Sequence, residues 1–182
     1  CALSSPNGGF GFTNGVEWYA TEKIDVHDAR SLNWGAQTNQ TRWLRQIHHL
    51  LRTHPAFFEQ TDIRLIQKGQ GNNIVIFRNH RPSGKKLVIL VNLGADHPTT
   101  VWWDPHDTEI HTTHYMDLLS GEPVDVNIHG ELYACNLAPG QALPVSMFSA
   151  NTNISSRELL TITSRSLRIT SVVASSRRLL TV

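Results

Sequence analysis

The stretch Leu87-Val88-Ile89-Leu90-Val91 contains five large aliphatic residues in succession, with no polar residue between them. A strand with one face in water alternates apolar and polar side chains, so an uninterrupted aliphatic run predicts a strand buried on both faces. The residues Pro82-Ser83-Gly84 just before it are typical of a turn. We therefore expect this stretch to be the central strand of a sheet.

Further short strands are expected on both sides of this stretch. Turn signals such as Gly69-Gln70-Gly71 separate them, and no second helical period appears after residue 60. Short strands at this regular spacing predict an antiparallel β-sandwich. The expected strands cover residues 63–67, 74–79, 87–93, 99–103, 111–117, 124–128, 131–137 and 142–147.

One amphipathic helix is expected over residues 39–54. Asn39 is a suitable N-cap, and Pro55 ends the helix. The apolar residues recur at spacings of three and four, which places them on one face. We expect Trp43 on this face to pack into a core. The face consists of Trp43, Leu44, Ile47, Leu50 and Leu51.

The chain divides into three parts of different composition: residues 1–58, residues 59–148 and residues 149–182. The first part opens with a short apolar piece, residues 1–3, which we expect to form a strand. A long loop rich in glycine, asparagine and aromatic residues follows, and then the helix. The expected fold class is therefore α+β, with a strand, a loop and a helix followed by an antiparallel all-β sandwich.

The formal net charge of +1 is unevenly distributed over the 182 residues. Residues 1–148 contain 11 Lys and Arg against 14 Asp and Glu, whereas residues 149–182 contain 5 Arg and a single acid, Glu158. This excludes a chain-wide basic surface for nucleic acid. Three interpretations of the tail stay open: a basic arm for an acidic partner, a β-prone segment, or sequence translated in the wrong reading frame.

Targeting signals are weak. The longest apolar runs fall far short of the roughly 20 residues that span a bilayer, and no charged segment followed by an apolar stretch opens the chain. We expect no membrane partner and a cytoplasmic location. The chain begins with Cys1 instead of Met, which suggests a fragment of a longer protein. Cys1 and Cys135 do not make a disulfide framework.

Four residues of the N-terminal loop have the side chains that sugars prefer. Sugar C–H faces stack on indole rings, while sugar hydroxyls bond to carboxylates and amides. Glu17, Trp18, Asn33 and Trp34 provide these groups. The alternative is that the two tryptophans anchor the loop and contact no ligand.

Acids also cluster in this loop, at Glu17, Glu22, Asp25 and Asp28. Paired carboxylates can perform acid–base chemistry on a glycosidic bond if their separation is right. The alternative is that these acids cap turns or face solvent. Asp104 and Asp107 have the same two interpretations, and we assign no catalytic residue.

Histidines are scattered through the first 148 residues, and His111 and His114 are three residues apart. On a strand these two positions point to opposite faces, so they are not expected to share a zinc ion. No phosphate-binding or dinucleotide-binding fingerprint is present. We expect neither a metal nor a cofactor. Trp102 and Trp103 are adjacent in an expected strand, so one ring should face the core and the other should face outward.

Several segments, taken in chain order, form a series: Gly15-Val16-Glu17-Trp18, Leu32-Asn33-Trp34-Gly35, His54-Pro55-Ala56-Phe57, residues 74–78, residues 87–93, residues 115–122 and Leu137-Ala138-Pro139-Gly140. This series resembles the C-terminal part of alpha-amylase superfamily enzymes (glycoside hydrolase family 13) over about residues 1–146. The resemblance implies that residues 1–58 are the last strand, loop and helix of a (β/α)8 barrel. Residues 59–148 would then be the C-terminal β-sandwich of these enzymes.

The resemblance also implies a function. The parent enzyme would cleave or transfer α-glucosyl units of starch, glycogen or maltodextrin through a covalent glycosyl-enzyme intermediate. The family's catalytic Asp, Glu and Asp come from earlier barrel strands, and no segment here matches them. The chain alone is therefore expected to be inactive. Glu17, Trp18, Asn33 and Trp34 would lie at the rim of the active-site mouth, in contact with an α-glucan.

Two further expectations follow from the sequence. A barrel helix without its barrel strands would expose apolar surface at residues 39–54, so the isolated chain should self-associate.

Two other classes of protein stay open beside the part of an enzyme. In one, the sandwich is an independent carbohydrate-binding module, and in the other the chain is a structural or interaction domain.

Overall fold

The computed structural model describes residues 2–5, 9–21, 31–66 and 71–147. The chain divides into two units, Cys1–Phe148 and Ser149–Val182, and every described residue belongs to the first unit. The tail predicted at residues 149–182 lies outside the described residues. Among the described residues, no helix is both long enough and apolar enough to cross a membrane.

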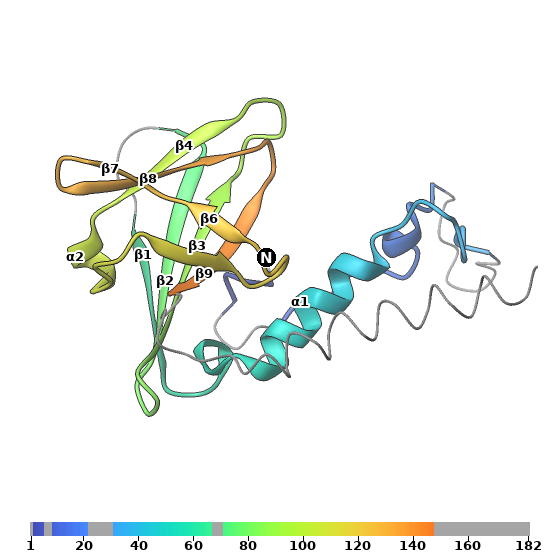
Figure 1. Ribbon diagram of the computed structural model, residues 1–182. Helices are drawn as coiled ribbons and strands as arrows, with labels where there is room; N and C mark the ends of the chain where they lie inside the picture. Colours follow the sequence, from blue (N-terminus) through green and yellow to red (C-terminus); the bar gives the residue numbers. More distant parts are fainter. Residues whose placement is uncertain (1, 6–8, 22–30, 67–70, 148–182) are drawn as a thin grey trace, which may run out of the picture. The chain divides into compact units, whose positions relative to one another are not determined.

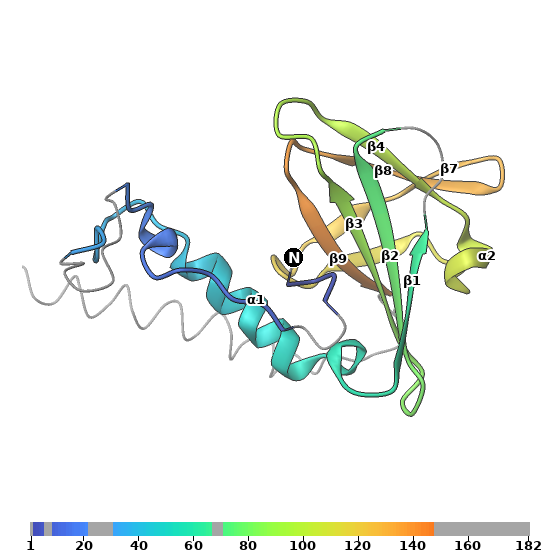
Figure 2. The same ribbon diagram turned by 180° about the vertical axis from the view of Figure 1, so that it is seen from behind.

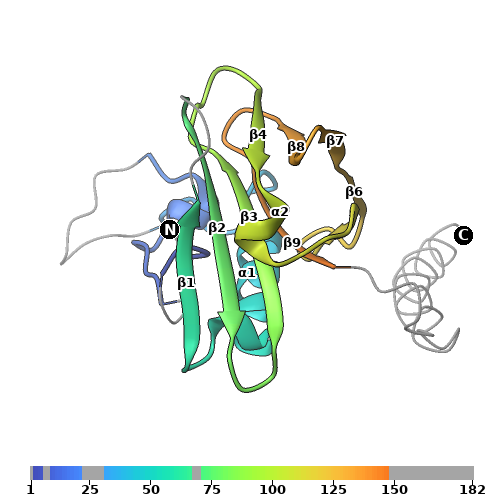
Figure 3. The same ribbon diagram turned by 90° about the vertical axis from the view of Figure 1, so that its left-hand side faces the viewer.

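The described residues form nine strands in two antiparallel sheets (Figure 1). The larger sheet has the strand order β1-β2-β3-β9-β5-β6, and the smaller sheet has the order β4-β8-β7. Figure 3 shows β1, β2 and β3 in one layer and β7 and β8 in the other. The predicted antiparallel sandwich is thus confirmed. The strands are β1 (Thr61–Ile66), β2 (Asn73–His80), β3 (Lys85–Asn92), β4 (Thr99–Trp103), β5 (His114–Asp117), β6 (Pro123–Asp125), β7 (Asn127–His129), β8 (Leu132–Leu137) and β9 (Ala142–Met147).

The described helical segments are short, and the longest is the helix that the sequence predicts. Asn39 caps it from just outside, because its Oδ1 accepts a hydrogen bond from the Thr41 backbone N–H at 3.1 Å. Pro55 follows the helix directly and begins a separate turn. The segments are the 3₁₀ helices η1 (Val16–Trp18) and η2 (Pro55–Phe57) and the α-helices α1 (Thr41–Thr53) and α2 (Pro105–Thr108).

Strand β3 lies inside the larger sheet, between β2 and β9, and is buried on both faces. Val88 and Leu90 point to the interior between the two sheets, whereas Leu87 and Ile89 point to the opposite face. All four side chains have no exposed surface. Burying such a side chain is worth about 1.5–3 kcal/mol. The absence of alternation in this stretch therefore predicted its place correctly.

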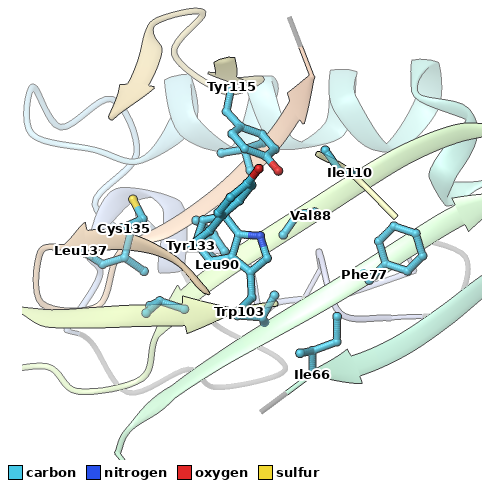
Figure 4. Close-up of a cluster of buried hydrophobic side chains, with 13 residues drawn as sticks. Ile66, Phe77, Val88, Leu90, Trp103, Ile110, Tyr115, Tyr133, Cys135 and Leu137 are labelled. Carbon is cyan, nitrogen blue, oxygen red and sulfur yellow. The ribbon is translucent and has the colours of Figure 1, made fainter. Parts of the chain in front are cut away.

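The core between the two sheets is built around three aromatic rings (Figure 4). The ring centroid of Trp103 lies 6.1 Å from that of Tyr115 and 5.8 Å from that of Tyr133, and both pairs are close to perpendicular. Perpendicular pairs bring the positive edge of one ring to the negative face of another, which stabilises them beyond their burial. Trp103 faces this core and Trp102 faces away from it, as the alternation of a strand requires.

A second core covers the other face of the larger sheet. It joins Leu50 of α1 and Phe57 of η2 to Leu87 and Ile89 of β3. Within α1, whose residues are all described, Leu50 alone is buried. Trp43 is 51% exposed, so this chain does not cover it, which agrees with the apolar surface that we expect this helix to expose. The helix packs on the sheet only through its C-terminal half, and Trp43 lies almost two turns before Leu50.

The N-terminal residues join this second core without forming a strand. Residues 2–5 form a turn, whereas the sequence predicts a strand beginning at residue 1. Leu3 is buried in the second core, and its carbonyl and that of Ser5 accept hydrogen bonds from Arg78 of β2. A strand needs a neighbouring strand for its backbone groups, and here a side chain bonds to two of these carbonyls. Figure 2 shows this segment beside the larger sheet.

Two predicted strands differ from those observed. The sequence predicts one strand over residues 124–128, whereas β6 pairs with β5 in the larger sheet and β7 pairs with β8 in the smaller sheet. The chain changes sheets at Val126, which still packs against the core and so keeps the apolar pattern unbroken. The strand predicted over residues 111–117 begins only at His114.

Candidate functional site

A tight turn of residues 13–20 places Trp18. The backbone N–H groups of Trp18 and Ala20 both donate to the Gly15 carbonyl, at 3.0 and 2.9 Å. Gly15 has a φ of 99°, and a Cβ at this position would lie 2.9 Å from the Ala20 Cβ. Both the left-handed backbone and the lack of space require glycine here. Gly15 therefore sets the geometry of the turn.

Glu17 holds this turn together through its side chain and its backbone. Its Oε2 accepts a hydrogen bond from the Gly15 backbone N–H at 2.9 Å. Its carbonyl accepts one from the Gln40 backbone N–H at 2.8 Å, which ties the turn to the start of α1. One carboxylate oxygen is therefore used inside the protein, and the other makes no hydrogen bond to any described residue.

The fold brings Trp18 close to Asn33 and Trp34, although more than a dozen residues of the sequence lie between them. The Asn33 Nδ2 donates to the Trp18 carbonyl at 2.6 Å. The rings of Trp18 and Trp34 have their centroids 5.2 Å apart with their planes at 44°. Trp34 is 78% exposed, so most of its indole faces solvent. The arrangement offers a broad, partly open aromatic surface beside polar groups.

Three non-glycine residues around this surface have a left-handed backbone: Tyr19, Leu32 and Asn33, with φ values of 54°, 45° and 54°. Such a conformation costs on the order of 1–3 kcal/mol for a residue that is not glycine, and it is concentrated at functional sites. Two of the three flank the tryptophans directly in sequence. The strain identifies this loop as a candidate binding site.

A pocket of about 250 Å³ lies among these residues, with Trp18 and Trp34 in its lining. The indole Nε1 of Trp18 is buried and has no hydrogen-bond acceptor among the described residues. An unsatisfied buried donor costs about 1–3 kcal/mol. A ligand hydroxyl that reached this nitrogen would recover that cost. The lining also includes Asn14, Gly15, Glu17, Ser31 and Leu32.

The described part of the loop does not contain a catalytic pair. Glycoside hydrolysis uses two carboxyl groups held roughly 5–9.5 Å apart. Glu17 is the one carboxylate among the described residues that line the pocket. Glu22, Asp25 and Asp28 lie outside the described residues. The described site can therefore bind a ligand, but it lacks the second carboxyl group that glycoside hydrolysis needs, with one group as the acid and the other as the nucleophile.

None of the other described candidates lines this pocket. Asp104 caps α2, because its Oδ1 accepts from the His106 backbone N–H at 2.8 Å. The rings of His106 and His111 lie 5.1 Å apart, and His111 precedes β5, so the argument from strand alternation does not apply to it. Within the described residues, no group of three or more His, Cys, Asp or Glu could hold a metal ion.

Arg78 is the residue that the sequence analysis missed. It is fully buried in β2, and its side chain donates to the Ala56 carbonyl at 2.8 Å and to the Leu3 carbonyl at 3.0 Å. Burial lowers the pKa of this guanidinium to about 10. A signal was available, since Arg78 shares one face of the strand with Ile74 and Ile76. It acts on the N-terminal segment and lies apart from the aromatic pocket.

Comparison with known proteins gives a likeness in fold. No family model matches the sequence, and no curated protein sequence matches it. A noncanonic maltogenic alpha-amylase from Thermotoga neapolitana has a similar structure, with a TM-score of 0.58 and 18% sequence identity. The match covers 75% of this chain and 32% of the amylase. The chain thus spans about a third of the length of that enzyme.

A second solved structure is less similar. It is described as an alpha-N-acetylgalactosaminidase from Bacillus halodurans C-125, with a TM-score of 0.43, 17% identity and coverage of 58% of this chain and 25% of that one. This TM-score is too low to establish a shared fold. The likeness to the amylase establishes the fold alone, a β-sandwich preceded by a helix, and it agrees with the resemblance of the sequence to the C-terminal part of alpha-amylase superfamily enzymes.

Proposed function

We propose that this chain is the C-terminal portion of an α-glucan-active glycoside hydrolase or glucanotransferase. In this proposal residues 1–58 are the last strand, loop and helix of a (β/α)8 barrel, and residues 59–148 are the sandwich that follows it. The shared fold with part of a maltogenic alpha-amylase supports the proposal. The order of the matching sequence segments supports it independently of the fold.

The observation that carries the proposal is the pocket lined by Trp18 and Trp34, beside which Asn33 bonds to the Trp18 carbonyl. Sugar rings stack on indoles and bond to amides and backbone groups beside them. The residues chosen for their side-chain chemistry and for the family resemblance support this proposal, because together they offer stacking and hydrogen-bonding groups to a glucosyl unit. We assign it to the rim of the active-site mouth, where it would position an α-glucan chain.

Catalysis is assigned to parts of the parent enzyme outside this chain. The reaction needs a carboxylate nucleophile and a carboxyl acid on opposite sides of the glycosidic bond. Glu17 already bonds to Gly15 and ties the loop to α1, which suits a positioning role. The described residues therefore bind and orient the glucan, and the chain alone releases no reducing ends from it.

The proposal includes self-association of the isolated chain. Large apolar side chains are exposed around the aromatic loop, including Phe12 at 42%, Val16 at 49% and Tyr19 at 51%. Exposed apolar side chains in one region favour association with another surface. In the parent enzyme the rest of the barrel would cover these apolar side chains and leave the pocket of Trp18 and Trp34 open. Sedimentation velocity of the isolated chain should show species larger than a monomer, and a clean monomer would contradict this part of the proposal.

The decisive experiment is to sequence the coding DNA upstream of the Cys1 codon. The proposal requires an open reading frame that continues upstream through alternating strands and helices, with Asp, Glu and Asp at strand ends. An in-frame stop codon followed closely by a start codon would contradict it. The matched protein measurement is a reducing-end assay on the chain with soluble starch, for which we expect no activity.

A further inference from the structure

A second groove lies between the N-terminal half of α1 and the strands of the sandwich. Its volume is about 670 Å³. Trp43 of α1 lines one part of it, and the rest is lined by the turn between β5 and β6, by β6 itself, by the starts of β7 and β9 and by Cys135 and Asn136 of β8. The polar side chains in its lining are Asp117, Ser120, Glu122, Asp125, Asn127, Asn136 and Gln141.

Trp43 contributes a large aromatic surface to this groove. Its side chain is 51% exposed, although it lies on the same helix face as the buried Leu50. The guanidinium of Arg42 lies 5.8 Å from the ring centroid, within the range of a cation–π contact. An indole that is half in solvent and lines a groove is a stacking platform for a flat, weakly polar ligand face.

Hydrogen-bond acceptors are available on the side of the sandwich. Glu122 and Asp125 are exposed, and their carboxylates have no partner among the described residues. Asp117 differs, because its Oδ1 accepts from the Leu119 backbone N–H and its Oδ2 accepts from Ser120. Asp117 therefore shapes the turn, while the other two carboxylates face solvent and can accept from a ligand.

Hydrogen-bond donors are available as well. The Asn136 Oδ1 accepts from the Thr100 hydroxyl at 2.7 Å, which fixes the amide and leaves its N–H groups for a ligand. The Gln141 Oε1 accepts from the Ala138 backbone N–H at 2.8 Å with the same effect. Asn127 is exposed at the start of β7. The groove thus offers both donors and acceptors, and the amides of Asn136 and Gln141 are held in place by the bonds that their oxygens accept.

We propose that this groove binds a neutral oligosaccharide, with one sugar ring against Trp43 and its hydroxyls between the carboxylates and the amides. Sugar hydroxyls donate and accept at once, and this lining supplies partners for both. The described lining contains acids and no Lys or Arg, which disfavours an anionic ligand. Its carboxylates form no metal-binding group. The site is separate from the rim, and the proposed function enters only in the choice of an α-glucan as the first probe.

The test uses the full chain with its tryptophans labelled with ¹⁵N. The sequence contains 5 tryptophans, so single Trp→Phe variants assign each indole N–H signal. Maltoheptaose, and cellohexaose as a β-linked probe, are titrated into the Trp34→Ala variant, which removes the rim platform. We expect the Trp43 signal to move and to saturate. Asp125→Ala should weaken binding about tenfold through the loss of one bond to a charged group.

Matched controls separate binding from folding. Glu131→Ala removes an exposed acid from the turn before β8, outside the groove, and should leave the affinity unchanged. Far-UV circular dichroism checks that each variant is folded. If neither sugar moves the Trp43 signal, the groove proposal is overturned, whatever happens at Trp34. The same titration is made on the chain without substitutions. If its Trp34 signal moves while its Trp43 signal stays, the rim assignment gains support and the groove proposal fails.

Discussion

The guanidinium of Arg78 lies 4.3 Å from the ring centroid of Phe57, and both side chains are buried. The same guanidinium donates to the carbonyls of Ala56, Leu3 and Ser5, at 2.8, 3.0 and 2.9 Å. One cation on β2 thus connects the segment after α1 with the N-terminal residues. The planar arrangement of its N–H groups suits this task, because they point in several fixed directions at once.

Replacement of Arg78 by lysine should therefore destabilise the chain. A lysine ammonium keeps the charge but cannot reach all three carbonyls or stack on the ring, which leaves buried acceptors unpaired. We expect the free energy of unfolding to fall by about 2–4 kcal/mol. For a chain of this size the midpoint of thermal unfolding should fall by about 5–15 °C. Circular dichroism during heating measures it.

Arg64→Lys is the matched control for this substitution. Arg64 also lies over a ring, with its guanidinium 4.7 Å from the centroid of Phe77, but about half of its side chain is exposed. Its contact with Glu109 at 3.5 Å is an exposed ion pair, and such pairs contribute roughly 0–1 kcal/mol. Equal effects of the two substitutions would show that the buried carbonyl contacts of Arg78 have no special weight.

The stability of the chain should depend on pH through His54. Burial lowers the pKa of His54 below its usual value of 6.5, and the positive charges of Lys85, Arg78 and His80 lower it further. Well above pH 6.5 the imidazole is neutral in both the folded and the unfolded chain. As the pH falls, the unfolded chain takes up the proton first, so the free energy of unfolding declines until the folded-state pKa is passed.

The variant His54→Asn should flatten this dependence. In the native chain the His54 Nδ1 accepts from the Ala56 backbone N–H at 3.2 Å, and an asparagine Oδ1 can replace that acceptor without titrating. Thermal unfolding of both proteins at about pH 7.5 and about pH 5 measures the difference. His111→Asn, at an exposed position, serves as the control. An identical loss of stability at the lower pH in the native chain and in His54→Asn would contradict the assignment.

The sandwich could be predicted from the sequence because its signals are local. The aliphatic run of residues 87–91 and the turn residues between strands depend on neighbours within a few positions, and the observed strands follow them closely. For Trp43, helix periodicity gives the face of the residue but not how far along the helix the packing partner extends. Leu50 and Trp43 share a face, yet only Leu50 meets the sheet.

The contacts that build the aromatic pocket could not be predicted in this way. The bond from Asn33 to the Trp18 carbonyl joins residues 15 positions apart in a region without periodic structure. The side-chain chemistry and the family resemblance nevertheless pointed to Glu17, Trp18 and Trp34, which line one pocket, and to Asn33, which bonds to the Trp18 carbonyl beside it. Arg78 was missed because its partners are backbone carbonyls, which leave no trace in the types of residue present.

The turn that places Trp18 should not tolerate a side chain at position 15. Gly15→Ala combines a left-handed backbone with a Cβ only 2.9 Å from the Ala20 Cβ, and we expect a loss of about 2–4 kcal/mol. Gly35 also has a left-handed backbone, with a φ of 83°, but nothing lies within 4 Å of an added Cβ. Gly35→Ala should therefore cost only about 1 kcal/mol. Urea unfolding followed by tryptophan fluorescence separates the steric cost from the backbone cost.

The role of Glu17 can be tested by comparing its amide and its alanine variants. Glu17→Gln keeps an oxygen that accepts from the Gly15 backbone N–H, whereas Glu17→Ala removes it. If Glu17 positions the loop, maltoheptaose binding at Trp34 should persist in Glu17→Gln. In Glu17→Ala it should weaken about five- to tenfold, from the loss of about 1–1.4 kcal/mol in loop order. The Trp34 indole signal during titration reports this affinity. A catalytic or charge-dependent role would require the opposite pattern, in which the amide is as damaging as alanine, because glutamine keeps the hydrogen bond but neither the negative charge nor the ability to accept a proton.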